Sequence, residues 1–258
     1  MIEVKYGVRS KVASVGHAHP LPVDYIMGNL PEARVTQSRP FTNVGVDYCG
    51  PFYIKKKRDR NRRQVKVYVD IFVCLAVKAV HIELVGDLTS ETFIAALRRF
   101  IARQGFCSTI HSDNGTNFIG ANNELKELHN LLKSDDHNEK VNPFLADKQI
   151  EWRFMSPHSP HFVGLWEAAA KSFKHHFRCI VGNKLLTFEQ FNIIIKIESV
   201  LNSRPLTPIS TDLKDLLALI PGDFLIDNSL RSLRKRDFGD TPSNRLSRWQ
   251  HIQQIKHF

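Results

Sequence analysis

The order of the expected secondary-structure elements is the feature that most restricts the fold of this chain. Three apolar, strand-like segments follow one another at 41–49, 66–77 and 79–85, separated only by polar connections, and helical and strand-like segments alternate after them. Sequential strands joined by turns pair antiparallel, whereas strands joined through helices run parallel. The sequence therefore predicts an α/β fold, with a mixed five-stranded sheet flanked by helices on both faces.

The alternating part of the chain supplies the remaining elements. One helix is expected between Thr89, a suitable N-cap, and Gly105, a suitable stop. Thr187 and Gln190 have the spacing of a capping box, which opens a later helix. The other expected elements are strands at 106–111 and 150–154 and helices at 121–133, 165–181 and 187–201. The tail from 205 is expected to be an irregular, poorly packed extension.

Length and composition limit the domain organisation and the compartment. The chain has 258 residues, 42% of them hydrophobic, which suffices for one sizeable core with extensions. We expect a linker at 1–37, a core domain at 38–210 and a C-terminal extension at 211–258. The four cysteines lie far apart without a CxxC motif, so we expect reduced, mostly buried thiols and no disulfide or zinc framework. We expect neither secretion nor a membrane span, because the N-terminus has no apolar signal region and the longest apolar run, 71–77, is short.

The charge of the chain favours a polyanionic partner. The formal net charge is +10 and the sequence pI is about 9.5. This balance alone does not separate DNA from RNA or from a membrane surface. Seven of the nine residues at 55–63 are basic, in the sequence KKKRDRNRR. This segment could be a solvated hairpin tip or a site of phosphate contact, and the sequence does not decide between the two.

The octapeptide HSDNGTNF at 111–118 has two possible explanations. Asp, Asn and Gly favour turns, because Asn and Gly tolerate a left-handed backbone and Asp accepts hydrogen bonds within its own turn. Alternatively, Asp113 is a carboxylate held at the end of a strand, where a metal ion could bind. The choice between the two depends on other acids in the chain.

Three acids occupy suitable positions. Asp47 lies on the first expected strand, Asp113 ends the fourth, and Glu167 lies in the first turn of a later helix. Reactive groups gather at the carboxyl ends of parallel strands, so the three side chains would converge if the first and fourth strands are neighbours. Converging carboxylates repel unless divalent cations separate them, and hard oxygen ligands suit Mg²⁺ or Mn²⁺. A pair of such ions stabilises the entering and leaving oxygens of a phosphoryl displacement.

The helix that follows Glu167 supports this interpretation. At about 100° per residue, Glu167, Lys171, Lys174 and Arg178 lie within roughly 40° of one line. The alternative is an ordinary Glu–Lys pair on a solvated helix face. A separate apolar stripe should face the core and comprises Trp166, Ala170, Phe173 and Phe177.

Four segments resemble the integrase catalytic core of retroelements, most closely that of BEL/Pao LTR retrotransposons. They are VGVDYCGPF, HSDNGTNFIGA, SPHSPHFVGLWEAAAKSFK and LNSRPLTP, and the resemblance covers roughly 35–225. It implies a ribonuclease-H-like fold and a catalytic triad of Asp47, Asp113 and Glu167 that binds two Mg²⁺ or Mn²⁺ ions. It also implies 3′-end processing of element DNA, followed by strand transfer into target DNA.

The resemblance implies further roles and partners. Lys171 and Lys174 match lysines that contact DNA ends, with Arg178 on the same stripe, and Asn114, Gly115 and Asn117 match the turn that shapes the site. Nuclear localisation and a homo-oligomer when full length are expected. The usual zinc domain and small β-barrel are not recognisable in the sequence, so we expect a fragment of a polyprotein or a degraded or domesticated copy.

Two other functions stay open. One is a non-catalytic DNA-binding remnant, and the other is a ribonuclease-H-type nuclease. The nuclease is disfavoured because the last acid lies on a helix with a cationic stripe behind it. Asp70 is expected to be structural or to lie beside a metal ligand, and Glu83 and Glu151 to face solvent. The histidines around Glu167 are expected at the surface or in contact with DNA and not as zinc ligands: His158, His161, His175 and His176.

Overall fold

The structure is a computed structural model, and it describes residues 30–55, 64–134, 149–155, 160–182, 185–191, 194–210 and 217–226. The chain divides into two compact units, Met1–Pro31 and Glu32–Phe258, and almost all described residues belong to the second. The predicted domain boundaries after 37 and 210 stay predictions. Most of the basic segment at 55–63 and the loop at 135–148 lie outside the described residues.

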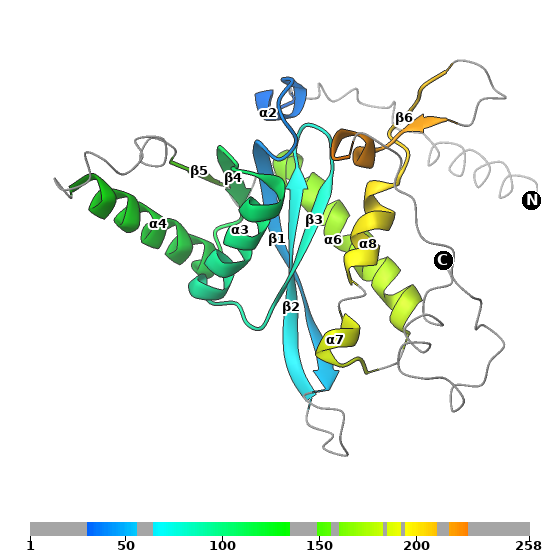
Figure 1. Ribbon diagram of the computed structural model, residues 1–258, viewed down its shortest axis with the longest axis horizontal. Coiled ribbons are helices and arrows are strands. Elements are labelled where there is room, and N and C mark those ends of the chain that lie inside the picture. The colour runs from blue at the N-terminus through cyan, green and yellow to red at the C-terminus, as the bar shows by residue number, and fades with distance from the viewer. Residues whose placement is uncertain are drawn as a thin grey trace, which may run out of the picture. The chain divides into compact units, whose positions relative to one another are not determined.

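Five strands form one mixed sheet. They are β1 (Asn43–Lys55), β2 (Gln64–Cys74), β3 (Val80–Val85), β4 (Thr109–Ser112) and β5 (Glu151–Phe154), in the order β3-β2-β1-β4-β5 (Figure 1). β1 pairs antiparallel with β2, and β2 with β3, whereas β4 runs parallel to both β1 and β5. This order confirms the predicted ribonuclease-H-like fold class.

Helices cover both faces of the sheet, because the central strands are apolar on both sides. On one face, Val44, Val46 and Phe72 pack against α3 (Ser90–Gln104) and α4 (Thr116–Ser134). On the other, Val69, Ile71 and Val73 pack against α6 (Pro160–Val181) and α8 (Ile194–Asn202). Figure 1 shows α3 and α4 on one side of the sheet and α6 and α8 on the other. The helix side chains that build the two cores are Phe93, Phe100, Phe118 and Ala121 on the first face and Trp166, Phe173, Ile197 and Leu201 on the second.

The two predicted ends of α3 are confirmed. The Thr89 hydroxyl accepts a hydrogen bond from the Thr92 N–H, and Gly105, with φ of 84°, ends the helix. Arg39 binds the exposed carbonyls at this end, donating to the oxygens of Gln104 and Phe106. A cation at a helix C-terminus also interacts favourably with the helix dipole.

Several predicted boundaries were wrong. The helix expected from 121 begins at Thr116, so the motif residue Asn117 lies in its first turn. The helix expected from 165 begins at Pro160, because proline fits the first helical turn, where no intrahelical N–H bond is needed. The helix expected at 187–201 is described as two segments, α7 (Phe188–Phe191) and α8, after the confirmed capping box of Thr187 and Gln190.

The described part of the C-terminal region, 205–210 and 217–226, is better packed than predicted. It contains the paired short strands β6 (Thr207–Pro208) and β7 (Ala218–Leu219) and the 3₁₀ helix η1 (Pro221–Phe224). Pro221 and Gly222 are buried. Near the N-terminal end, α2 is a single turn at Glu32–Val35. In the described part of the chain, no helix combines the length and apolarity needed to cross a membrane.

Side chains occupy the outer edge of β3. Asn202 of α8 accepts from the Val80 N–H at 2.7 Å and donates to the Val80 carbonyl at 2.8 Å. Glu198 accepts from the Ile82 N–H at 2.9 Å, and Arg99 donates to the Leu84 carbonyl at 3.2 Å. These side chains take the place of a sixth strand, since they satisfy the backbone groups that an edge strand otherwise exposes.

We expect Asn202→Leu to destabilise the fold by about 1–3 kcal/mol, because the buried N–H and C=O of Val80 would lose both partners. Chemical denaturation measures this change. Ser203→Ala is the matched control, since the exposed Ser203 hydroxyl donates only within its own helical turn, to Ser199. Equal effects of the two substitutions would contradict the role given to Asn202.

Candidate active site

The parallel register of β1 and β4 brings Asp47 and Asp113 together. The last registered pair is Gly45 with His111, and two residues further along each strand lie Asp47 and Asp113. Alternate residues of a strand point to the same face, so both carboxylates extend from the face that α6 covers. The first and fourth strands are neighbours, which is the condition under which the two acids were expected to lie side by side.

The turn explanation of the HSDNGTNF octapeptide is confirmed, and the metal-site explanation stays a prediction. β4 ends at Ser112, and the Asp113 carboxylate accepts a hydrogen bond from the Gly115 N–H at 3.0 Å. This bond makes a local turn, from which α4 starts at Thr116. The same bond holds the exposed carboxylate of Asp113 at the end of the strand.

Asp47 experiences the charges of the other two acids. The pKa of Asp47 is raised from 3.8 to about 6. Burial is the largest cause, and the negative charges of Asp113 and Glu167 act in the same direction. The N–H of Tyr48, which donates to Asp47 at 2.8 Å, and the charge of Lys174 act in the opposite direction. Hard carboxylate oxygens that repel one another in this way are a donor set that fits Mg²⁺ or Mn²⁺.

The three acids are near one another without forming a closed ligand group. Among the described residues, no three His, Cys, Asp or Glu side chains are grouped closely enough to hold a metal ion. The exposed carboxylate of Glu167 instead lies 3.8 Å from the ammonium group of Lys171, one turn along α6. The triad therefore stays a prediction.

The two predicted stripes of α6 are present. Trp166, Ala170 and Phe173 are buried, and Phe177 packs against the same core. The opposite stripe, from Glu167 through Lys171 and Lys174 to Arg178, is exposed. The pKa of the Cys49 thiol on β1 is raised to about 12, mainly by burial. The positive charges of Lys174 and Arg178 lower this pKa, so both side chains lie near Cys49. The cationic stripe thus continues from the acids along β1.

Trp166 packs directly on the backbone of β1. Its side chain is 2% exposed, and its ring lies over Gly45, where an added Cβ would be only 2.2 Å from Cε3. No side chain larger than hydrogen fits at Gly45 while the ring keeps this place. The sequence signal was available, since glycine inside a strand often marks a close approach of another group.

The chain was compared with known proteins. No family model and no curated protein matches it. It is similar in fold to retroviral integrase cores. In an intasome of simian T-cell lymphotropic virus bound to PP2A regulatory subunit B56 gamma, the matched chain is 14% identical with a TM-score of 0.48, over 88% of this chain and 70% of that one.

Two isolated core domains give a similar result. The HTLV-2 integrase catalytic core with magnesium, in its dimeric form, is 17% identical with a TM-score of 0.45, over 73% of this chain and 98% of that one. The BIV integrase catalytic core is 16% identical with a TM-score of 0.45, over 72% and 95%. Similarity at this level assigns no activity, substrate or metal to this chain.

The two asparagines of the turn differ in their surroundings. Asn114 is exposed, whereas Asn117 is half-buried in α4 beside Tyr48. The Asn117 amide is close enough to the Tyr48 hydroxyl to lower its pKa. However, neither the Asn117 Nδ2 nor this hydroxyl has a hydrogen-bond partner among the described residues. The two groups are therefore neighbours without a hydrogen bond between them.

Asp70 lies on the other face of the sheet from Asp47. It pairs with Tyr48 across β1 and β2, is fully buried, and has no hydrogen-bond partner among the described residues. Burial raises the pKa of Asp70 well above its usual value. The role predicted for it, structural or beside a metal ligand, stays a prediction.

The prediction that Glu83 faces solvent was wrong. Glu83 is buried, and its carboxylate accepts from His81 at 3.1 Å and from Arg99 at 2.6 Å. Burial would raise its pKa, but these partners lower it. The prediction failed because both faces of β3 are covered. Glu151, given the same prediction, is exposed as expected.

Sequence reasoning also overlooked a histidine–cysteine pair. His175 and Cys179, one turn apart on the exposed surface of α6, have Nε2 and Sγ 3.7 Å from each other. The i,i+4 spacing was the available signal. His176 is half-buried, and His158 and His161 lie outside the residues whose side chains are described. Cys49, Cys74 and Cys107 are buried free thiols, as predicted.

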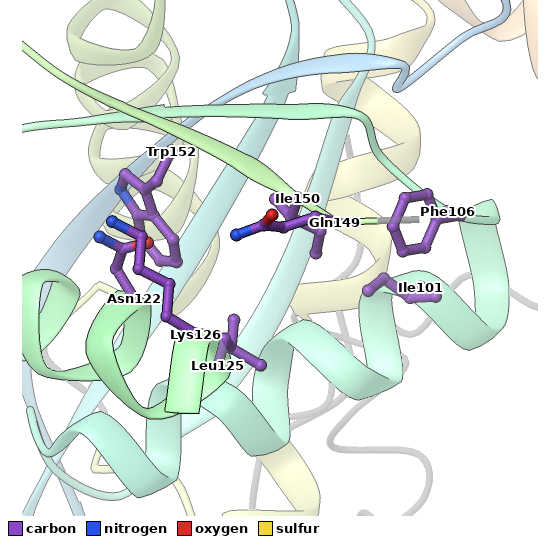
Figure 2. A pocket seen from close by; sticks show the side chains of 8 residues that line it. All are labelled: Ile101, Phe106, Asn122, Leu125, Lys126, Gln149, Ile150 and Trp152. Carbon is purple, nitrogen blue, oxygen red and sulfur yellow. The ribbon is translucent and has the colours of Figure 1, made fainter. Parts of the chain in front are cut away.

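A separate cavity of about 200 Å³ lies between the end of α3, α4 and the start of β5 (Figure 2). Its walls are mostly apolar, and three polar side chains reach it. The lining residues are Ile101, Phe106, Leu125, Ile150, Trp152, Asn122, Lys126 and Gln149. None of the three acids borders it, so this cavity is not part of the candidate active site.

Proposed function

We propose that this chain is the catalytic core of a retroelement integrase, a metal-dependent polynucleotidyl transferase of the BEL/Pao type. The observation that carries the proposal is the arrangement around Asp47. The β1–β4 register aligns it with Asp113, and the charges of both Asp113 and Glu167 act on it. One carboxylate inside β1, a second directly after the end of β4 and a third on the covering helix α6 supply the oxygen ligands that a two-metal phosphoryl transfer site uses.

The residues divide into two roles. Asp47, Asp113 and Glu167 would hold two Mg²⁺ or Mn²⁺ ions, which when bound activate a nucleophile and stabilise charge on the phosphoryl oxygens. Lys171, Lys174 and Arg178 present exposed cations that suit phosphates of a DNA backbone. Asn114 and Asn117 flank the turn that fixes Asp113, where Asn114 is free to contact a nucleotide.

The proposed substrates are the 3′ ends of element DNA and a target duplex. The net charge of +10 supports a polyanionic substrate. We propose that the core spans 38–210 between a linker and an extension, that the full-length protein acts as a homo-oligomer, and that it works in the nucleus. The exposed stripe on α6 is the surface that would bind the element ends.

A strand-transfer assay tests the proposal. Purified protein, Mn²⁺ and element-end DNA should give joined products, and Glu167→Gln should reduce joining by at least about 100-fold while leaving DNA binding within a few-fold of wild type. Lys126→Gln is a control for charge changes remote from the acids, since Lys126 lines the separate cavity. Equal joining by wild type and Glu167→Gln would reject the catalytic assignment.

A non-catalytic DNA-binding remnant is the second candidate. It is supported by the pairing of Glu167 with Lys171 at 3.8 Å, which uses the third acid as an ordinary helix-surface ion pair. The same assay separates the candidates. DNA binding without joining in wild type and Glu167→Gln alike would favour the remnant.

A further inference from the structure

We propose that Gly45 and Trp166 are positioning residues, whose contact sets where Glu167 lies relative to Asp47. The inference deepens the proposed function and rests on it. It concerns how the chain holds its third acid, which comes from a different element than the first two.

The contact between Gly45 and the Trp166 ring leaves almost no room for a larger side chain at position 45. An added Cβ at Gly45 would be 2.2 Å from Cε3, 2.8 Å from Cζ3 and 3.0 Å from Cδ2 of the Trp166 ring. Contacts below 3.0 Å between a Cβ and ring atoms force one of the two groups to move. The indole is 2% exposed, so the ring is held on its other sides by the core. Gly45 therefore permits α6 to lie close to β1 at this level.

The contact is one layer beneath the acids. Gly45 precedes Asp47 by two residues on β1, its registered partner His111 precedes Asp113 by two on β4, and Trp166 directly precedes Glu167 on α6. Gly45, His111 and Trp166 form a layer beneath the acids, and they belong to the same three elements as the acids: β1, β4 and α6. His111, 4% exposed, completes the layer from β4, and both of its ring nitrogens lack a partner among the described residues.

A displacement at this layer is passed on to Glu167. Trp166 and Glu167 are consecutive residues of one rigid helix, so a shift or rotation of the ring moves the neighbouring carboxylate by a similar amount. Misplacement of a catalytic group by about 1 Å can reduce a rate about 100-fold. The exposed cations of the stripe lie one to three turns further along α6 and are not in this layer. Metal affinity should therefore suffer more than DNA affinity.

The test compares Gly45→Ala, Trp166→Leu and the double variant, with Mn²⁺ binding followed by electron paramagnetic resonance. Each single substitution should weaken Mn²⁺ binding by about 10-fold or more. The double variant should bind more tightly than Gly45→Ala, because the smaller leucine makes room for the new methyl group. Trp166→Leu introduces no clash, so it serves if Gly45→Ala does not fold. Phe173→Leu is the matched control, a fully buried α6 aromatic further from the acids.

A second measurement does not depend on metal. Asp47→Cys and Glu167→Cys are combined with Cys179→Ser, and the rate of joining the two introduced thiols by a short bifunctional reagent is recorded with and without Gly45→Ala. Gly45→Ala should lower this rate several-fold, whereas Phe173→Leu should not. Absence of Mn²⁺ binding by wild type, together with this lower rate, would reject the proposed function and leave the positioning role standing.

The opposite pattern would overturn the positioning role. Folded Gly45→Ala and Trp166→Leu proteins that bind Mn²⁺ like wild type, with an unchanged cross-linking rate, would show that the contact does not place Glu167. Equal losses in Phe173→Leu would show a general effect of core damage instead.

Discussion

Asp47→Asn is expected to abolish metal-dependent DNA joining and at the same time to stabilise the metal-free protein at pH 7. The loss of a metal ligand should reduce joining at least about 100-fold. The gain in stability should be about 1–3 kcal/mol, because the substitution removes a half-buried negative charge that Asp113 and Glu167 repel. Thermal and urea unfolding without divalent cations measure the second effect, and the assay above measures the first.

The pH dependence of this gain follows from the direction of the shift. Folding raises the pKa of Asp47 from 3.8 to about 6, so the folded protein holds this proton more tightly than the unfolded chain. The stability that the protonated carboxyl contributes is full below about pH 4 and is lost as the pH rises to about 6. Wild type and Asp47→Asn should therefore be nearly equal in stability at pH 4 and differ above pH 6.

Asp87→Asn is a control of opposite sign. Hydrogen bonds from Thr92 and Thr89 lower the pKa of Asp87, so its contribution to stability is present at neutral pH and is lost as the pH falls. Asp87→Asn should therefore destabilise the protein at pH 7. If Asp47→Asn is also less stable than wild type at pH 7, then Asp47 is not a strained carboxylate in the metal-free fold.

Glu83→Ala is expected to destabilise the fold by about 3–5 kcal/mol, the largest effect on stability that we predict. Glu83 joins β3 to α3, because its buried carboxylate accepts from His81, Arg99 and Arg103. Among the described residues, its removal leaves the buried His81 with Glu198, at 3.6 Å, as its one acidic partner. Urea unfolding monitored by circular dichroism provides the free energy of unfolding.

Glu151→Ala is the matched control for this experiment. Glu151 also forms an ion pair with an arginine, Arg153, at 2.9 Å, but both side chains are more than half exposed. Solvent-exposed pairs contribute about 0–1 kcal/mol, so this variant should unfold almost like wild type. Similar losses in Glu83→Ala and Glu151→Ala would show that burial of the Glu83 network does not contribute as argued.

The same two glutamates show where sequence patterns succeed and where they stop. The expectation of solvent exposure was correct for Glu151, because β5 has a solvated face. It failed for Glu83, because β3 is covered on both faces and a charged residue can be buried there when partners from α3 and β3 itself reach it. The arginine partners, Arg99 and Arg103, lie 16 and 20 residues further along the chain on α3, so no local pattern predicts their pairing with Glu83.

The candidate site was predictable to a similar extent. The fold order placed Asp47 beside Asp113, since parallel strands with a period of two align residues two positions beyond a registered pair. Helical periodicity likewise separated the buried Trp166 from the exposed Lys171 and Lys174. The depth at which α6 lies on β1 was not predictable. It depends on the fit of one ring against one glycine, which neither periodicity nor composition encodes.

The occupied edge of β3 has a consequence for self-association. Asn202, Glu198 and Arg99 already bind the outward backbone groups of Val80, Ile82 and Leu84, so an invading peptide would have to displace three side chains before it could add to that side. At the other end of the sheet, β5 has no further strand beside it among the described strands. Addition of a strand from another molecule is therefore hindered at the β3 edge of the sheet.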